Sequence, residues 1–269
     1  MTPVALTIAG SDPSGGAGLQ ADLKTFHQHR VYGMSVVTLL TVQNTQSVRA
    51  VQVLDPAVVL AQLDAVLSDI PPQAAKAGAL GNAGVVRAIA ERLAGCPFPL
   101  VVDPVMISKH GARLIDEQAV AALQERLLPC AALVTPNLQE AEVLCGIAVR
   151  DLAAMEKAAH LIARQGARGV LIKGGHLEGK AVDLLWANGA LYHLVAPRLD
   201  TRHTHGTGCV YSAAITALLA RGEDLLSSVQ RAKQFVTRAM ETPPRLGGGF
   251  GPTNMFAKTA CRKDPGGRE

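Results

Sequence analysis

The sequence predicts a three-layer αβα sandwich built around a mostly parallel, doubly wound sheet. Short runs rich in β-branched residues alternate along the chain with longer amphipathic segments. Several short runs are apolar at every position, which is typical of strands covered on both faces, and right-handed crossovers place helices on both sides. The 269 residues are 48% hydrophobic, enough for one large core. We expect residues 1–257 to form a single domain and the polar residues 258–269 to form a flexible tail.

The first part of the chain begins with a strand at 4–9, VALTIA, which leads through the glycine-rich turn GSDPSGGAG into a helix at 19–30. Two runs that are rich in valine predict strands at 34–43 and 47–54. An Asp-Pro pair, which supplies a cap and a first-turn proline, then opens a helix with an apolar period at 55–70.

The middle of the chain alternates in the same way. A strand-like run at 74–80 precedes a helix at 82–95 that ends in glycine. The near-continuous apolar run FPLVVDPVM predicts a strand at 98–106. A single helix is expected at 116–129 and a strand at 131–137.

The last part of the chain contains a predicted hairpin among further helices. AVDLLWANG and ALYHLVAPRL are joined by Asn188-Gly189, a dipeptide typical of two-residue hairpin turns. The other expected elements are helices at 138–146 and 152–166, a strand at 169–175, a helix that follows Cys209 and a helix at 224–240.

Composition and charge argue against several classes of protein. A net charge of +4 from scattered residues and only 3% aromatic residues argue against nucleic acid as a partner. No segment has the roughly 18 apolar residues of a membrane span, and the first residues lack the basic region of a signal peptide. Five cysteines without a CxxC pair fit reduced thiols better than disulfides or a zinc site. We therefore expect a cytoplasmic protein that does not bind membranes.

Polar residues recur where the expected strands end. In a doubly wound sheet the carboxyl ends of the strands form the ligand-binding edge, so these side chains are expected to gather there. They are Asp12, Gln43, Asn44, Asp103, Asn137 and Lys173.

Most of these residues allow both a structural and a functional interpretation. The loop GSDPSGGAG matches neither the P-loop nor GxGxxG, so it is either a helix-capping turn or a phosphate cradle, and Asp22 after it is typical of a solvated acid. Asp103, held by the following proline, suits a metal site or a turn. Asn137 and Glu140 either face one cleft or form a capping box, and their spacing alone favours the capping box. Lys173, before two glycines, either faces a phosphate or extends into solvent.

The segment THGTGC, residues 204–209, is the strongest functional candidate. Its two glycines allow backbone amides to converge on an anion where a helix begins. A thiol at a helix N-terminus is expected to have a lowered pKa. The alternative is that Cys209 is a small buried apolar residue, as most free cysteines are. The coincidence of thiol and glycine turn favours a functional role.

The chain resembles the ribokinase-like superfamily and, within it, the hydroxymethylpyrimidine/phosphomethylpyrimidine kinases of thiamine biosynthesis. The matching segments are TIAGSDPSGGAGLQADLKTF, YGMSVVTLLTVQNTQSV, VVDPVM, LVTPNLQEAE, VLIKGGH, THGTGC and GFGPTNMF, in this order from residue 6 to about residue 256. The first segment in combination with GTGC is highly specific to this family.

The resemblance implies a ribokinase-like fold and an ATP-dependent reaction. The hydroxymethyl group of 4-amino-5-hydroxymethyl-2-methylpyrimidine is phosphorylated first, and its monophosphate is then converted to the pyrophosphate. Mg²⁺ is the implied metal ion, near Asp103 and Glu140. A homodimer is expected because members of the superfamily often dimerise.

The resemblance also implies roles for residues of the site. Those that match pyrimidine-binding positions are Gly10, Asp22, Gln43 and Val105. An aminopyrimidine edge offers a hydrogen-bond donor beside an acceptor, and one carboxamide such as that of Gln43 can bond to both. Asn137, Lys173 and Thr207 match positions that contact the nucleotide. Gly206, Thr207, Gly208 and Cys209 match the anion hole and the catalytic position. Lys173 is also counted among the catalytic residues.

The proton acceptor is expected to be Cys209, as a thiolate, although most of the superfamily has an aspartate at this position. Two other residues depart from the family pattern. Ala79 replaces a methionine beside the pyrimidine. This change either enlarges the pocket or leaves a neighbour such as Met106 to contact the pyrimidine instead. Phe250 replaces a histidine near the end of the chain.

Three alternatives remain open from the sequence. A pyridoxal or pyridoxine kinase of the same superfamily has a similar hydroxymethyl ring as substrate. A Cys-dependent hydrolase would use Cys209 as nucleophile with His203 or His205 as base. A non-catalytic nucleotide-binding module is disfavoured, since it has no use for a thiol at the transfer point.

Overall fold

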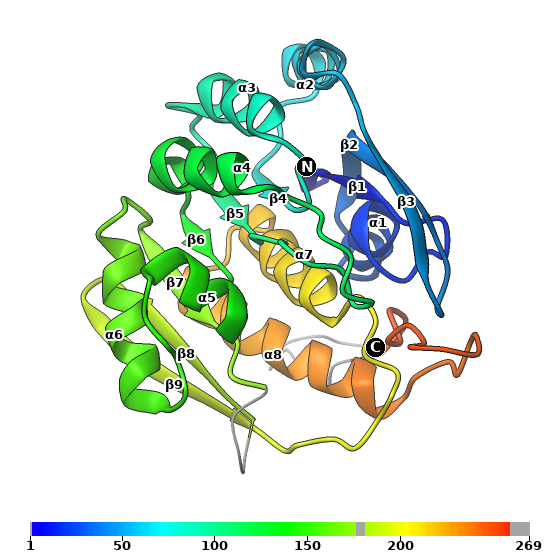
Figure 1. Ribbon diagram of the computed structural model, residues 1–269, viewed down its shortest axis with the longest axis vertical. Coiled ribbons are helices and arrows are strands. Elements are labelled where there is room, and N and C mark those ends of the chain that lie inside the picture. Colours follow the sequence, from blue (N-terminus) through cyan, green and yellow to red (C-terminus); the bar gives the residue numbers. More distant parts are fainter. Residues whose placement is uncertain (1, 176–180, 259–269) are drawn as a thin grey trace, which may run out of the picture.

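The computed structural model describes residues 2–175 and 181–258, in which helices and strands alternate along the chain (Figure 1). The strands are β1 (Val4–Ser11), β2 (Tyr32–Gln43), β3 (Val48–Val53), β4 (Ala74–Ala77), β5 (Leu100–Val102), β6 (Leu133–Val134), β7 (Gly169–Ile172), β8 (Ala181–Ala187) and β9 (Ala190–Ala196). The α-helices are α1 (Gly18–Gln28), α2 (Pro56–Asp69), α3 (Ala83–Leu93), α4 (Glu117–Ala122), α5 (Leu138–Cys145), α6 (Leu152–Ala163), α7 (Thr207–Ala220) and α8 (Leu225–Glu241). A π-helical turn, η1 (Leu123–Leu127), and a 3-10 turn, η2 (Leu128–Cys130), follow α4.

The strands form one sheet in the order β3-β2-β1-β4-β5-β6-β7-β8-β9. Every pairing from β2 to β7 is parallel, whereas β3 at one edge and β8 and β9 at the other pair antiparallel. The strand order runs outward in both directions from β1 and β4, as in a doubly wound sheet. The predicted fold class is therefore confirmed.

Helices cover both faces of the sheet because successive strand residues point to opposite sides. In β5, Leu100 and Val102 belong to the core that also contains α2 to α6, whereas Val101 belongs to the core that contains α7 and α8. Helices α7 and α8 pack side by side on their face of the sheet (Figure 1). The carboxyl ends of the parallel strands are thus framed by helices from both layers.

Local sequence explains several boundaries. Asp55 accepts a hydrogen bond from the N–H of Ala57, and α2 opens with Pro56, as the Asp-Pro pair predicts. The hairpin between β8 and β9 turns at Asn188 and Gly189, whose φ angles of 51° and 77° suit a type I′ turn. Both predictions are confirmed.

Two elements differ from the sequence-based prediction. The strand expected at 98–106 is limited to β5, since Pro104 has no N–H to donate to a neighbouring strand. The single helix expected at 116–129 divides into α4, η1 and η2, and the last turn tightens where Pro129 cannot supply a helical hydrogen bond.

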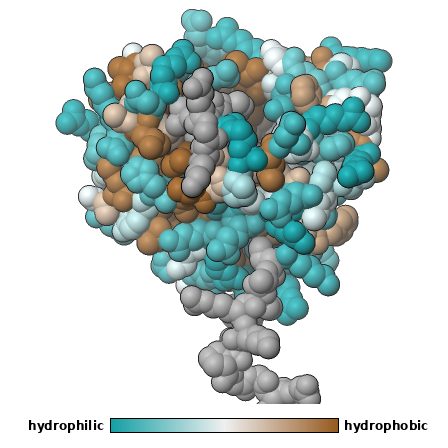
Figure 2. All heavy atoms as spheres, turned by 90° about the horizontal axis from the view of Figure 1, so that it is seen from below, coloured by the Kyte–Doolittle hydropathy of each residue, from teal (hydrophilic) through white to brown (hydrophobic). Residues whose placement is uncertain are grey.

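The described part of the chain contains no helix that is both long and apolar enough to cross a bilayer. Hydrophilic and hydrophobic residues are intermixed over the coloured part of the face in Figure 2. Of the predicted flexible tail, residues 259–269 lie outside the described residues.

Candidate active site

The N-terminus of α7 is built from the segment THGTGC. Gly206 is the N-cap and has φ +75°, a left-handed conformation that favours glycine. The Thr207 hydroxyl donates to the carbonyl of Thr204 at 2.8 Å, and the Thr207 N–H bonds the same carbonyl. Helix geometry leaves the next amides, those of Gly208 and Cys209, without partners within the helix. This helix end therefore offers N–H donors and the positive end of a dipole to an anion.

A buried ion pair lies directly against this helix end. Lys173 Nζ is 2.9 Å from Asp103 Oδ1, and the Lys173 side chain is only 17% exposed. A Cβ on Gly208 would lie 3.2 Å from Lys173 Nζ and 3.8 Å from Asp103 Oδ2, so the start of the helix packs closely against the pair. The alternative in which Lys173 extends into solvent is wrong.

Two hydroxyl groups hold the Asp103 carboxylate in place. Thr135 Oγ1 donates to Oδ1 and Ser212 Oγ donates to Oδ2, each at 3.1 Å. Burial raises the pKa of Asp103, but the charges of Lys173 and Lys76 outweigh it, and the pKa lies below its ordinary value. Asp103 is therefore an ionised, fixed carboxylate.

Asn137 and Glu140 form the capping box that their spacing favours. The Asn137 side chain accepts the N–H of Glu140 at 2.9 Å, and Glu140 Oε2 accepts the N–H of Asn137 at 2.8 Å. Burial and the charge of Asp103 raise the pKa of Glu140 to about 7, against the attraction of Lys173 and hydrogen bonds from backbone N–H groups, including that of Met106. Glu140 thus caps helix α5 and also lies close to the Lys173–Asp103 ion pair.

Cys209 lies in the first turn of α7, where its sulfur accepts a hydrogen bond from the N–H of Gly18. Burial raises the pKa of the thiol to about 11, and the charges of Asp22 and Asp103 add to this, whereas Lys76 acts in the opposite direction. The expected lowering of this pKa is therefore wrong for the unliganded site. A helix terminus stabilises a thiolate only when desolvation and nearby negative charges do not exceed its effect.

Asp22 is wholly buried beneath Cys209 rather than solvated. Its Oδ1 accepts a hydrogen bond from Lys76 Nζ at 2.5 Å, and its Oδ2 accepts one from Thr7 Oγ1 at 2.6 Å. Lys76 is also fully buried, and the negative charges around it, that of Asp22 first, raise its pKa although burial alone would lower it. Asp22 and Lys76 therefore form a buried ion pair.

Lys76 was missed by the sequence analysis. The available signal was a lysine inside the apolar run AAKAGAL, since buried lysines almost always have a charged partner. Its neighbours Ala75 and Ala77 face the opposite layer, which directs Lys76 toward α1 and α7.

The remaining residues implied to bind the pyrimidine lie near the loop that follows β1. The Gln43 side chain hydrogen-bonds the Asp12 carboxylate. A Cβ on Gly18 would lie 2.3 Å from the carbonyl oxygen of Gly10, so that carbonyl faces the start of α1. Val105 is half-buried, and its N–H bonds the carbonyl of Asp103 at 2.8 Å across Pro104.

The two departures from the family pattern lie in different settings. The carbonyl of Ala79 accepts the Thr38 hydroxyl at 2.6 Å, and its small side chain is half-buried. Phe250 is 41% exposed and packs with its ring centroid 5.6 Å from that of His110, with Lys109 over the ring.

The hydrolase alternative requires a histidine against the thiol. The groups that act most strongly on the Cys209 sulfur are Lys76, Asp22, Asp103 and the N–H of Gly18, with no histidine among them, whereas His205 Nε2 lies 2.8 Å from Asp12 Oδ2. The thiol instead faces the N–H of Gly18 and the buried pair below it.

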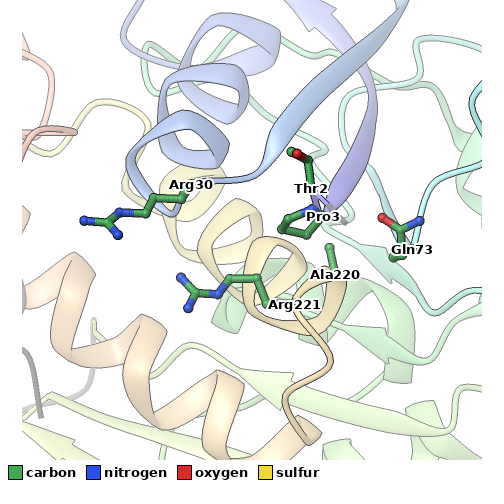
Figure 3. Close-up of a pocket in the computed structure, with 6 residues that line it drawn as sticks. All are labelled: Thr2, Pro3, Arg30, Gln73, Ala220 and Arg221. Carbon is green, nitrogen blue, oxygen red and sulfur yellow. The ribbon is translucent and has the colours of Figure 1, made fainter. Parts of the chain in front are cut away.

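A surface hollow lies away from these residues. It has a volume of about 400 Å³ and is lined by Thr2, Pro3, Arg30, Gln73, Ala220 and Arg221 (Figure 3). It opens beside the start of β1 and the C-terminus of α7, opposite the carboxyl ends of the strands. It contains none of the predicted site residues.

Oxygen ligands for a divalent cation are present at the active-site edge. Asp103 and Glu140 are hard carboxylate donors, and Mg²⁺ is usually bound through one or two carboxylates while waters and substrate phosphates complete its shell. No group of three or more His, Cys, Asp and Glu residues within residues 2–175 and 181–258 is arranged to hold a metal ion. The donor set therefore fits an ion that arrives with phosphates rather than a preformed cage.

Comparison with known proteins identifies close relatives over nearly the whole chain. The profile of the phosphomethylpyrimidine kinase family matches residues 12–254. A hydroxymethylpyrimidine/phosphomethylpyrimidine kinase from Haemophilus influenzae is 48% identical over 258 residues, which cover 94% of this chain and 96% of the relative.

Two solved structures share the fold. A phosphomethylpyrimidine kinase from Clostridium difficile is 42% identical with a TM-score of 0.78, and the match covers 88% of this chain and 98% of that one. A Bacillus subtilis pyridoxal kinase in complex with ADP is 38% identical with a TM-score of 0.89, and the match covers 96% of this chain and 98% of that one.

Proposed function

The chain belongs to the phosphomethylpyrimidine kinase family and is a phosphotransferase, and from this premise we propose its substrates and mechanism. It transfers the γ-phosphoryl group of ATP to 4-amino-5-hydroxymethyl-2-methylpyrimidine, and then a second phosphoryl group to the monophosphate. The observation that carries the mechanism is the N-terminus of α7, with its thiol, directly against the Lys173–Asp103 pair.

The chain's own residues neutralise and orient the phosphates. Phosphoryl transfer requires positioning and charge stabilisation more than covalent chemistry by the protein. The amides of Gly208 and Cys209 face the transferring group, with Gly206 and Thr207 fixing the turn that aims them. Lys173 supplies a fixed positive charge beside them, and Asn137 extends the same edge toward the nucleotide.

Mg²⁺ is part of the proposal. When bound with ATP it neutralises negative charge on the phosphates. Asp103, held by Lys173, Thr135 and Ser212, and Glu140 are the carboxylates that would hold the ion.

Cys209 is the residue that we propose accepts the proton of the substrate hydroxyl. In the unliganded site the thiol keeps its proton, because its pKa is about 11. Turnover then depends on the small thiolate fraction, so the rate is expected to rise with pH.

The pyrimidine is proposed to lie on the side of β1 and β2. Gln43, whose side chain also hydrogen-bonds Asp12, would contribute a carboxamide, the chain around Gly10 backbone groups, and Val105 an apolar side chain of the loop after β5. In this proposal Asp22 lies beneath the pyrimidine without direct contact, because its two carboxylate oxygens already bond Thr7 and Lys76.

The nucleoside of ATP is proposed to lie on the opposite side, toward β9 and α8. A hollow of about 630 Å³ lies there. Its lining residues include Val195, Pro197, Lys233 and Thr237. Lys233 bonds Asp183, and Asp183 accepts the N–H of Gly174 next to Lys173, so the hollow is structurally linked to the phosphate side.

Pyridoxal is the second candidate substrate, favoured by the 38% identity to the B. subtilis pyridoxal kinase. The test is ADP release by the purified chain with the pyrimidine alcohol and with pyridoxal as alternative acceptors. We expect the pyrimidine to have the higher kcat/KM. A higher kcat/KM for pyridoxal would overturn this choice of substrate.

A cytoplasmic homodimer completes the proposal. The described cysteines are free thiols, which suits a reducing compartment. Leu40 and Val42 expose 44% and 57% of their surface on one face of β2, and a second copy is proposed to cover them. Light scattering measures the mass, and a monomeric mass would contradict the dimer.

A further inference from the structure

Asp12 closes the loop after β1 by accepting hydrogen bonds at both carboxylate oxygens. Oδ1 accepts the N–H and the hydroxyl of Ser14, at 2.8 and 2.7 Å. Oδ2 accepts the N–H groups of Gly16 and Ala17, at 3.2 and 2.8 Å. The side chain is only 3% exposed. This one carboxylate therefore accepts four hydrogen bonds from its own loop.

His205 connects the same carboxylate to the active-site helix. Its Nε2 is 2.8 Å from Asp12 Oδ2, and it directly precedes Gly206, the N-cap of α7. Because the carboxylate has no proton to give, Nε2 is the donor. His205 Nδ1 is buried without a hydrogen-bond partner, so the bond to Asp12 is the ring's polar contact.

The two segments also touch without spare room. A Cβ on Gly206 would lie 1.8 Å from the carbonyl oxygen of Gly16, and a Cβ on Gly16 would lie 2.5 Å from Cδ2 of the His205 ring. The backbone N–H of His205 is held separately by the carbonyl of Gly251 at 3.1 Å. The Asp12–His205 bond therefore adds a side-chain link to a place where the loop and the start of α7 are already in close contact.

We propose that His205 is a positioning residue for phosphoryl transfer, which fixes the first-turn amides of α7 through its hydrogen bond to Asp12. This inference rests on the proposed function only in that the amides of Gly208 and Cys209 face the transferring group. Charge on that group develops in the transition state, so misplaced amides reduce kcat more than they change KM.

The test compares two amide replacements that differ by one methylene. In His205→Gln the side-chain NH₂ reaches the position of Nε2 and can still donate to Asp12. In His205→Asn the same group falls short. We expect kcat of His205→Gln to stay within about threefold of the wild type, and kcat of His205→Asn to fall about 10- to 100-fold, with KM for ATP and for the alcohol within about twofold.

The control is Ser14→Ala, which removes one bond to the same carboxylate at an exposed position without touching α7. It should leave kcat unchanged. Thermal melts identify any variant that is unfolded at the assay temperature, and assays are then run below its melting range. Equal kcat in the Gln and Asn variants, or a loss confined to KM, would overturn the inference.

A second readout is independent of the alcohol substrate. ADP with magnesium and aluminium fluoride mimics the phosphoryl group in transfer. Its affinity should fall in His205→Asn about as much as kcat does, whereas the affinity for ADP alone is kept. Unchanged affinity for the mimic would count against His205. An inactive wild type would count against the proposed function instead, and the mimic would still test His205.

Discussion

Charge balance at single residues governs the chemistry of this site. Lys76 pairs with Asp22 and Lys173 pairs with Asp103, which leaves Glu140 and Cys209 as the acidic groups without a cation of their own. The pKa of Glu140 is raised to about 7 and that of Cys209 to about 11. The Mg²⁺ that we propose would supply the positive charge that these two groups lack.

Replacement of Cys209 tests its role as proton acceptor. Cys209→Ala should lower kcat at least about 100-fold while binding of the pyrimidine persists, because a general base acts on the reacting proton. Near-normal turnover in this variant would exclude the role.

The pH dependence gives a second test of the same residue. With a thiol pKa of about 11, the wild-type kcat should rise about tenfold per pH unit on the alkaline side of neutrality, since the thiolate fraction rises so. Cys209→Asp, which is ionised throughout this range, should show a flat profile. A flat wild-type profile would contradict thiolate catalysis.

The buried pair below the thiol is tested through stability. Lys76→Met leaves Asp22 buried without its cation, and we expect a loss of about 3–5 kcal/mol in the free energy of unfolding. The double variant Lys76→Met with Asp22→Asn removes both charges and should recover part of that loss. Urea unfolding measures both, and a double variant no more stable than the single one would argue against an ion pair.

At the scale of elements, the sequence predicts the parallel sheet and most helices, but less of the detail at their ends. FPLVVDPVM is apolar over nearly its whole length, yet β5 ends before Pro104 because backbone pairing, not hydrophobicity, defines a strand. The Asn137–Glu140 box and the Asn188-Gly189 turn were predictable because all their atoms are local in sequence.

The buried partners of the site were not predictable in the same way. Lys76 and Asp22 are separated by 54 residues, and Thr7 and Asp22 by 15, so their pairing exists only once the sheet has formed. The pKa of Cys209 was misjudged for the same reason. The helix terminus is visible in the sequence, whereas burial and the charges of Asp22 and Asp103 come from other elements.

The two ends of α7 offer a matched test of why glycine begins this helix. Gly206 and Gly222 both have positive φ, +75° and +83°, but a Cβ meets the carbonyl of Gly16 only at Gly206, and nothing lies within 4 Å at Gly222. Gly222→Ala should cost about 1–2 kcal/mol of stability from its backbone conformation and keep kcat. Gly206→Ala should cost more stability and most of the turnover, as measured by urea unfolding and steady-state kinetics. Equal effects at the two positions would mean that the close approach does not matter.

At the scale of the whole molecule, Asp12 joins parts of the chain that are distant in sequence. It holds its own loop, and through His205 it holds the start of α7, 193 residues away. Although burial alone raises its pKa, hydrogen bonds from His205, Ser14 and Gln43 hold the pKa of the Asp12 carboxyl well below its usual range.

This low pKa predicts sensitivity to acid. A carboxyl with a depressed pKa binds fewer protons in the folded state than in the unfolded state, so its contribution is complete above the unfolded pKa of about 3.9 and is lost as the pH falls toward the folded pKa. The free energy of unfolding should therefore decrease below about pH 4 to 5, by about 1.4 kcal/mol per unit of depression.

The comparison for this prediction is Asp12→Asn. The variant should be less stable near pH 6 and should lose less further stability between about pH 5 and pH 2. Parallel losses in the two proteins, measured by urea unfolding across this range, would show that Asp12 is not responsible.

The proposed activity is tested directly by the mass of the product that the purified chain forms from 4-amino-5-hydroxymethyl-2-methylpyrimidine, ATP and Mg²⁺. We predict a monophosphate first and then a product that carries two phosphates, with one ADP released for each phosphoryl group transferred. ATP-dependent phosphorylation of pyridoxal, with the pyrimidine recovered unchanged, would contradict the claim.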